Sequence, residues 1–238
     1  MNPYEKLLSR KRKWTPVQTT AGTCKEGAEE AIYRALALRH MELPVGDFIT
    51  DALEKNVPDS AKALLLSNVR DEENHDLALG YIANAYGVDP KAEKEALALQ
   101  KAWIEHPDHT IVKAMVAERA IFFVLLPFFR ANGDAGMRTV SADISRDEQV
   151  HVACNSLLVK ELGLEISPSL DKLRKATINW VMQPLKHKDP VRKLDKKFWL
   201  DSSDNLMYQG KAPELSFTKA ARMPAFFEHS NNDLPQYA

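Results

Sequence analysis

Glu72-Glu73-Asn74-His75 and Glu148-Gln149-Val150-His151 are two copies of a Glu-x-x-His motif in a chain of 238 residues. Each copy has a glutamate 30 positions upstream, Glu42 before the first copy and Glu118 before the second, so the two sets are offset by a constant 76 positions. Four carboxylates and two imidazoles arranged in this way are the ligand set of a dinuclear metal site inside a four-helix bundle. The repeat therefore predicts an all-α fold that is built around a metal centre.

The upstream glutamates also meet a geometric condition for sharing one site with the motifs. In an antiparallel helical hairpin, residues at the same height lie equally far from the turn. The midpoint between Glu42 and Glu72 is position 57, and the midpoint between Glu118 and Glu148 is position 133. Both midpoints fall within polar, Pro- or Gly-containing turn sequences. Each upstream glutamate is therefore expected to face its motif across a helical hairpin.

The spacing within each motif matches the chemistry of a metal site. Residues i and i+3 lie on one helix face, so the glutamate and histidine of each motif can point at one centre. Carboxylate oxygens suit Fe and Mn, and the imidazoles favour Fe over Mg or Ca. The alternative is that these are surface glutamates and ordinary packed histidines. A single Glu-x-x-His would leave that alternative open, but two copies with symmetric partners favour the metal site, since four buried glutamates without metal would repel one another.

Hydrophobic spacing and turn signals divide the chain into an N-terminal arm (1–24), a helical bundle (25–186) and a partly ordered C-terminal tail (187–238). Pro44 and Gly46 predict a kink or break in the first helix of the bundle. The helices are predicted over 25–55, 60–86, 92–104, 110–130, 135–162 and 168–185.

Composition excludes several classes of protein. The formal net charge of −1 gives no argument for a nucleic-acid partner. Two cysteines, Cys24 and Cys154, are too few for a disulfide framework or a thiolate metal site. No apolar run approaches the roughly 20 residues that span a bilayer, and Lys, Arg and Pro interrupt the region where a signal peptide would begin. We therefore expect a soluble, cytoplasmic protein without a membrane partner.

Several segments resemble the small (β) subunits of class I ribonucleotide reductases, which belong to the ferritin-like superfamily. Ile144-Ser145-Arg146-Asp147-Glu148-Gln149-Val150-His151 closely resembles their Arg-Asp-Glu-x-x-His signature, and Glu118-Arg119-Ala120-Ile121-Phe122-Phe123 resembles their third-helix glutamate with its aromatic followers. Trp14-Thr15-Pro16 resembles the Trp-x-Pro that carries the radical-transfer tryptophan, and 231–238 is similar in kind to the tail that docks on the large (α) subunit. The resemblance covers 14–162 and the last few residues, and implies a minimal form of a kind that phages could carry.

The resemblance implies a ferritin-like four-helix bundle with additional helices and assigns roles to individual residues. The implied metal ligands are Glu42, Glu72, His75, Glu118, Glu148 and His151. Asp147 would hydrogen-bond a ligand histidine and link it to Trp14, and Tyr208 or Tyr237 would relay the radical to the large subunit. The implied function is that of the radical-generating small subunit of ribonucleoside-diphosphate reductase. Its oxygen-activated dimetal centre would oxidise a large-subunit cysteine for deoxyribonucleotide synthesis, and the chain would be a homodimer.

Three features depart from the family pattern and keep alternatives open. Glu42 stands where the family usually has aspartate, and the chain is shorter than typical members. Leu79 stands four residues after His75, where the stable radical tyrosine normally lies. Because leucine cannot store a radical, a Mn/Fe or Mn/Mn centre is favoured over a di-iron centre. The alternative function is a stand-alone dimetal oxygenase or oxidase that acts on an aldehyde or a fatty-acid-like substrate. Iron storage is a third candidate, which the helix at 168–185 and the long tail disfavour.

Overall fold

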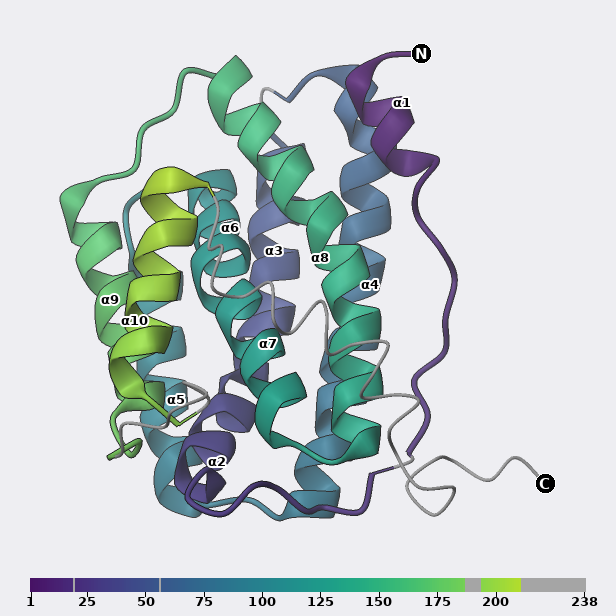
Figure 1. Cartoon of the computed structure of the whole chain (residues 1–238). Coiled ribbons are helices and arrows are strands. Elements are labelled where there is room, and N and C mark those ends of the chain that lie inside the picture. The colour runs from purple at the N-terminus through teal and green to yellow at the C-terminus, as the bar shows by residue number, and fades with distance from the viewer. Residues whose placement is uncertain (19, 56, 187–193, 211–238) are drawn as a thin grey trace.

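The computed structural model describes residues 1–18, 20–55, 57–186 and 194–210. All regular secondary structure in these ranges is helical (Figure 1), which confirms the predicted all-α fold. None of the described helices combines the length and apolar character that crossing a membrane would require.

Four rods of helix form the central bundle. They are α3 (Glu42–Leu53), α4 (Asp59–Tyr86), α6 (Thr110–Ala117) with η2 (Glu118–Phe122) and α7 (Phe123–Asn132), and α8 (Ala135–Glu161). The helix α3 packs on α4 and α7 packs on α8, and α4 and α6 both contact α8. The turns between α3 and α4 and between α7 and α8 lie where the sequence midpoints predicted.

Local sequence explains where the long helices begin and end. Gly87 ends α4 with a φ of 83°, a left-handed value that favours glycine. The next helix starts at once, since the side chain of Asp89 caps it and Pro90 occupies its first position. The side chain of Asp134 likewise accepts a hydrogen bond from the backbone N–H of Met137 and starts α8 directly after the turn.

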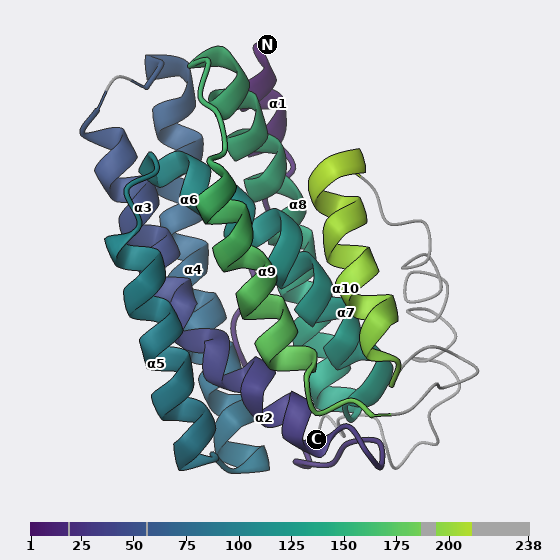
Figure 2. The same ribbon diagram turned by 90° about the vertical axis from the view of Figure 1, so that its left-hand side faces the viewer.

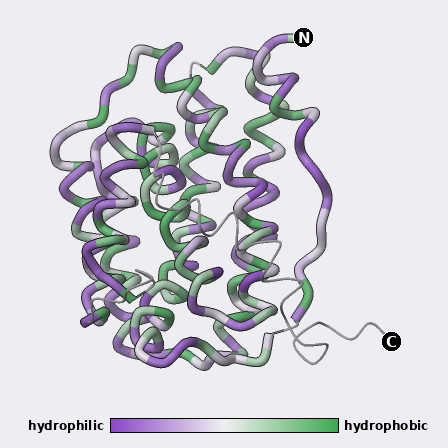
Figure 3. The backbone as a smooth tube through the Cα atoms, in the orientation of Figure 1, coloured by the Kyte–Doolittle hydropathy of each residue, from purple (hydrophilic) through white to green (hydrophobic). Residues whose placement is uncertain are grey.

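Further helices flank the bundle, as Figure 2 shows. They are α1 (Pro3–Leu8), α2 (Glu29–Ala37), η1 (Leu38–Met41), α5 (Pro90–Glu105), α9 (Pro168–Met182), α10 (Lys196–Asp204) and η3 (Asn205–Gln209). Both α9 and α10 lie on the side of the molecule opposite α1 (Figure 1). The hydrophobic stretches gather along α6 and α7 in the middle of the molecule (Figure 3).

The break in the first helical region lies before the predicted place. The chain changes from α2 to the 3-10 segment η1 over Leu38–Met41, and α3 then runs without interruption through Pro44 and Gly46. The prediction of a break at Pro44 was therefore wrong. The reason is that Pro44 stands in the first turn of α3, where its missing N–H would have no partner within the helix anyway.

The helix α10 was not predicted, because its sequence shows no sustained hydrophobic period. It is held by a few large contacts instead: Trp199 is fully buried and packs edge-on against Phe128, with ring centroids 5.3 Å apart. Arg174 of α9, also fully buried, donates to Ser203 and Asp204. The predicted domain boundaries at 24 and 186 stay predictions, and Tyr237 lies outside the described residues.

The N-terminal segment is attached along the outside of the bundle, beside α4 and α8 (Figure 1). At its start, the buried Tyr4 donates a hydrogen bond to Glu161 over 2.6 Å. At its end, the backbone N–H of Lys25 donates to the carbonyl of Asn132 over 2.7 Å, next to the α7–α8 turn. Between these two anchors the segment crosses the outer face of the predicted metal site.

Candidate metal centre

The structure brings all six predicted metal ligands together in the middle of the bundle. Each is at most 2% exposed. Two of them stand at the first positions of their elements, Glu42 in α3 and Glu118 in η2, and the two Glu-x-x-His motifs face each other from α4 and α8. The i, i+3 spacing thus places the glutamate and histidine of each motif on the inner face of its helix.

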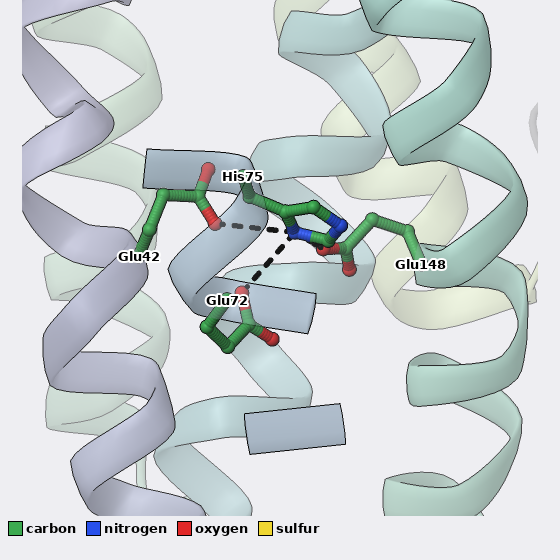
Figure 4. A group of neighbouring side chains, drawn as sticks. All are labelled: Glu42, Glu72, His75 and Glu148. Carbon is green, nitrogen blue, oxygen red and sulfur yellow. Dashed lines mark ion pairs between the residues drawn. The ribbon is translucent and has the colours of Figure 1, made fainter. Parts of the chain in front are cut away.

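One half of the centre gathers around His75 (Figure 4). The Nδ1 atom of His75 lies 3.3 Å from Glu72 Oε2, 3.3 Å from Glu148 Oε1 and 3.7 Å from Glu42 Oε2. These side chains come from three helices and point toward one another (Figure 4). We call this half the His75 position.

The other half gathers around His151. Its Nδ1 atom lies 3.0 Å from Glu72 Oε1, 3.7 Å from Glu148 Oε1 and 3.8 Å from Glu118 Oε1. We call this half the His151 position. Glu72 and Glu148 thus face both imidazoles, whose ring centroids are 5.7 Å apart. Two cations could therefore be held side by side, each by one histidine and one terminal glutamate, with Glu72 shared between them. Glu148 is close enough to His151 to be shared as well.

The donor atoms fit such a pair of cations. Within the part of the chain that the structure describes, all six side chains carry at least one buried oxygen or nitrogen without a hydrogen-bond partner. Both oxygens of Glu72 and of Glu148 are in this condition, as is Nδ1 of each histidine. Leaving a buried polar group unsatisfied costs about 1–3 kcal/mol, and more for a charged group. Metal coordination would satisfy all of these atoms at once, so the residues fit a dinuclear Fe or Mn centre.

Burial of several carboxyl groups side by side raises the pKa values of three of the glutamates. Burial, followed by neighbouring carboxylates, raises the pKa of Glu118 well above its usual value. Burial is also the largest cause of the raised pKa of Glu72 and of Glu148, although His75 opposes it in both. Without cations, the glutamates therefore tend to keep protons that a metal would displace.

Asp147 lies next to the cluster and contacts His75 and Trp14, the two partners that the family resemblance implied. The Nε2 atom of His75 lies 3.4 Å from Asp147 Oδ2, and the indole N–H of Trp14 donates to the same oxygen over 2.6 Å. The rings of Trp14 and His75 are stacked with centroids 6.3 Å apart. Burial opposes ionisation of Asp147, but the hydrogen bonds from His75 and Trp14 outweigh it and lower its pKa. Such a carboxylate orients a ligand imidazole so that its other nitrogen faces the metal.

A second supporting carboxylate, Asp71, was missed by the sequence analysis. The Nε2 atom of His151 lies 2.9 Å from Asp71 Oδ2, so Asp71 supports His151 as Asp147 supports His75. The signal was available, since Asp71 precedes Glu72 as Asp147 precedes Glu148, at the same offset of 76 positions. Each aspartate pairs with the histidine of the opposite motif.

Glu118 receives support that spacing alone did not indicate. Asn155 of α8 donates from Nδ2 to Glu118 Oε2 over 2.6 Å. Glu118 also begins the π-helical segment η2, where a local shift in backbone hydrogen bonding occurs, as is frequent at functional sites. The carbonyl of Ala120 in this segment accepts a hydrogen bond from Ser203 of α10 over 2.6 Å. The helix α10 therefore contacts the element that carries Glu118.

The remaining residues of the sequence prediction are Leu79, Tyr208 and Tyr237. Leu79 is 4% exposed on α4, one turn after His75. Tyr208 is 60% exposed in η3, where its hydroxyl donates to Asp171 over 2.5 Å. Among the described residues, Tyr208 makes no direct contact with the six side chains of the cluster, although Arg119 of η2 donates to the carbonyl of Leu206 in the segment of Tyr208. Tyr237 is not among the described residues.

Comparisons with known proteins show a likeness to a solved structure. No model of a protein family matches the chain, and no curated protein matches it. Among solved structures, a crystal structure described as a "putative class I ribonucleotide reductase from Bacillus halodurans" superposes with a TM-score of 0.57 at 18% sequence identity. The match covers 95% of this chain and 98% of that one. At this level of identity the likeness establishes the architecture: the chain has the same ferritin-like fold as that structure, over nearly the whole length of both.

Proposed function

We propose that this chain is the radical-generating small subunit of a class I ribonucleotide reductase, with a large subunit as its partner. The observation that carries the proposal is the contact series from the cluster to the surface segment: His75, Asp147 and Trp14 are joined through one carboxylate oxygen. A dimetal oxygenase needs the cluster, but it has no need of a tryptophan joined to a ligand in this way. The fold shared with the Bacillus halodurans structure supports the same reading.

The residues of the chain have distinct parts in this function. The four glutamates and two histidines would hold the metal ions, which when activated by an oxygen species supply a strong one-electron oxidant. Trp14 would donate an electron toward the centre, and the carboxylate of Asp147, which accepts the hydrogen bond from its indole N–H, is placed to receive the indole proton. A tail tyrosine, Tyr208 or Tyr237, would pass an electron from a cysteine of the large subunit to Trp14.

The buried Leu79 bears on the identity of the metals. A stored tyrosyl radical would need a tyrosine against the cluster, and this position on α4 holds a side chain that cannot be oxidised. We therefore propose that the oxidising equivalent is stored on the metals, in a Mn/Fe or Mn/Mn centre. A stable tyrosyl radical signal in electron paramagnetic resonance spectra of active protein would contradict this assignment.

Nucleotide reduction tests the proposed function. The full chain is loaded with Fe, Mn or both under air and mixed with a large subunit from the same genome. Turnover should require both proteins and should fall by at least a hundredfold in Trp14→Phe and in a chain that ends at residue 210. Trp180→Phe is the matched control, because Trp180 lies on α9 and donates to Glu95, away from the cluster. Full activity of Trp14→Phe would overturn the proposal.

Leu79 also favours one second candidate, a stand-alone dimetal oxygenase or oxidase with an aldehyde or a fatty-acid-like substrate. This candidate predicts that the loaded chain consumes O₂ and converts such a substrate without any large subunit. Turnover in that assay, together with no nucleotide reduction under any metal loading, would favour the second candidate over the first.

A further inference from the structure

The outer faces of the two metal positions differ in charge, although their ligands match. Each position has one histidine, one terminal glutamate and a share in Glu72 and Glu148. Behind His75 stands Asp147, whose other partner is the neutral indole of Trp14. Behind His151 stands Asp71, whose other partner is the ammonium group of Lys11.

Lys11 of the N-terminal segment is buried next to His151. Its Nζ atom forms an ion pair with Asp71, lies 3.0 Å from Asn68 Oδ1 and lies 3.3 Å from His151 Nε2. The side chain of Lys11 is only 9% exposed, and Asn68 is fully buried. A lysine buried to this degree against a ligand histidine is rare on a protein surface segment and costs desolvation energy. Its placement therefore calls for a role beyond attaching the segment, which Arg12 and Trp14 also attach through Asp143 and Asp147.

The charge of each supporting group acts on the cation that its histidine binds. An aspartate behind a ligand imidazole makes the imidazole a stronger donor and attracts the cation. At the His75 position Asp147 pairs directly with no cation: its partner besides His75 is the neutral indole of Trp14, and Lys11 acts on it only from farther away. At the His151 position the ammonium of Lys11 cancels the charge of Asp71 and itself repels a cation.

We propose that Lys11 makes the two metal positions unequal, so that a divalent cation occupies the His75 position before the His151 position. The inference rests on the proposed dimetal centre and assigns Lys11 and Asp71 as positioning residues that set the order of metal binding. An unequal pair of positions is also what a mixed Mn/Fe centre needs, since identical positions would not sort two metals.

Metal titration of the full chain tests the proposal without any assay of activity. The metal-free chain is titrated with Mn²⁺ in a calorimeter, and crystals with one equivalent of Mn²⁺ are examined by anomalous X-ray scattering. We expect two binding steps whose dissociation constants differ by at least tenfold, with the first ion at the His75 position. Lys11→Met should tighten the second step by about tenfold, while Asp71→Asn should weaken it by about tenfold, the lower end of the usual effect of such supporting groups.

The opposite signs separate this role from a merely structural one. If Lys11 only holds the segment in place, Lys11→Met and Asp71→Asn both weaken metal binding, and that result would overturn the proposal. In the double variant of Lys11→Met and Asp71→Asn, two uncharged side chains replace an ion pair whose charges sum to zero. The dissociation constant of the second Mn²⁺ step should therefore return to within about threefold of the wild-type value. Lys13→Met is the matched control, since Lys13 is an exposed lysine of the same segment.

The outcomes also distinguish this inference from the proposed function. Two tight and equal steps, or a first ion at the His151 position, would overturn only the inference about Lys11. Failure of the wild-type chain to bind two ions would remove the dimetal centre and the proposed function with it. If Lys11→Met does not fold, a first ion at the His151 position of the wild-type crystal would still overturn the inference, as would a second binding step that Asp71→Asn leaves unchanged.

Discussion

Glu72 and Glu148 each face both imidazoles, whereas Glu118 faces only that of His151. This difference in geometry predicts a difference in metal content. Replacing a shared carboxylate removes a donor from both positions, while replacing a terminal one affects a single position.

We expect Glu72→Gln to retain fewer than about 0.5 metal ions per chain and Glu118→Gln to retain about one, against two in the wild type, because an amide is a poorer ligand than a carboxylate. Elemental analysis after gel filtration measures the content. Glu73→Gln is the control, since Glu73 is the exposed neighbour of Glu72 and should retain two ions. Equal loss in Glu72→Gln and Glu118→Gln would contradict the assignment of shared and terminal ligands.

Asp147 supplies a second prediction about a single residue. Asp147→Asn removes the charge behind His75, so Mn²⁺ affinity at the His75 position should fall by about 10- to 100-fold. Asp143→Asn is the comparison, because Asp143 pairs with Arg12 of the same N-terminal segment, away from the ligands. Similar losses in both variants would show that Asp147 acts by attaching the segment rather than by supporting His75.

Spacing was enough to predict that the six side chains would meet, because a repeat of i, i+3 pairs across two hairpins has few geometric solutions. Spacing did not lead to Asp147, which the family resemblance implied. It did not reach Lys11 or Asn155, since their contacts with the cluster depend on the path of the N-terminal segment and on the helix phase of α8. Asp71 lay within reach, because it repeats at the offset that defines the motifs.

At the scale of elements, α10 packs against α7 and against the π-helical segment η2 that carries Glu118. Trp199 fills the space against Phe128, and Ser203 donates to a carbonyl of that segment. The sequence did not predict α10 because a helix of nine residues held by one large aromatic shows little hydrophobic periodicity.

Trp199→Ala should lower the free energy of unfolding by about 3–5 kcal/mol, the usual cost of removing a large aromatic from a core. Chemical denaturation of the metal-free chain measures it. Tyr208→Phe, in the exposed neighbouring segment, should change stability by less than about 0.5 kcal/mol. A loss below about 1 kcal/mol in Trp199→Ala would mean that α10 is not part of the folded unit.

Proline and glycine did not predict where the first helical region breaks. Pro44 marked a break in the sequence, yet α3 begins at Glu42 and absorbs the proline in its first turn. The actual break is the 3-10 segment η1, which ends at Met41 directly before Glu42. The π-helical segment at Glu118 was equally invisible, because a shift of backbone hydrogen bonds leaves no fixed residue pattern.

For the whole molecule, the buried carboxylates predict how stability depends on pH. The pKa values of Glu72, Glu118 and Glu148 are raised above the usual 4.5. The metal-free folded chain thus keeps protons that the unfolded chain releases, so these groups stabilise it fully below about pH 4.5 and progressively less as pH rises through the raised values. The raised pKa of His75 acts in the same direction as those of the three glutamates, and the lowered pKa of His151 acts in the opposite direction.

The unfolding temperature of the metal-free chain should therefore fall between about pH 5 and 7, and metal ions should restore it by more at pH 7 than at pH 5. In Glu118→Gln, which has no such proton to lose, the fall with pH should be smaller than in the wild type. Calorimetric scans of both chains, with and without Mn²⁺, measure this. A metal-free wild type that gains stability over this pH range would contradict the assigned directions of the pKa shifts.

Anomalous X-ray scattering from crystals of the fully loaded chain tests most directly whether the six buried side chains hold two metal ions. Two peaks are expected, one bound by Glu42 and His75 and the other by Glu118 and His151, with Glu72 and Glu148 reaching both. A single peak, or metal bound elsewhere on the molecule while the cluster stays protonated, would contradict the dimetal centre and the radical-generating function that depends on it.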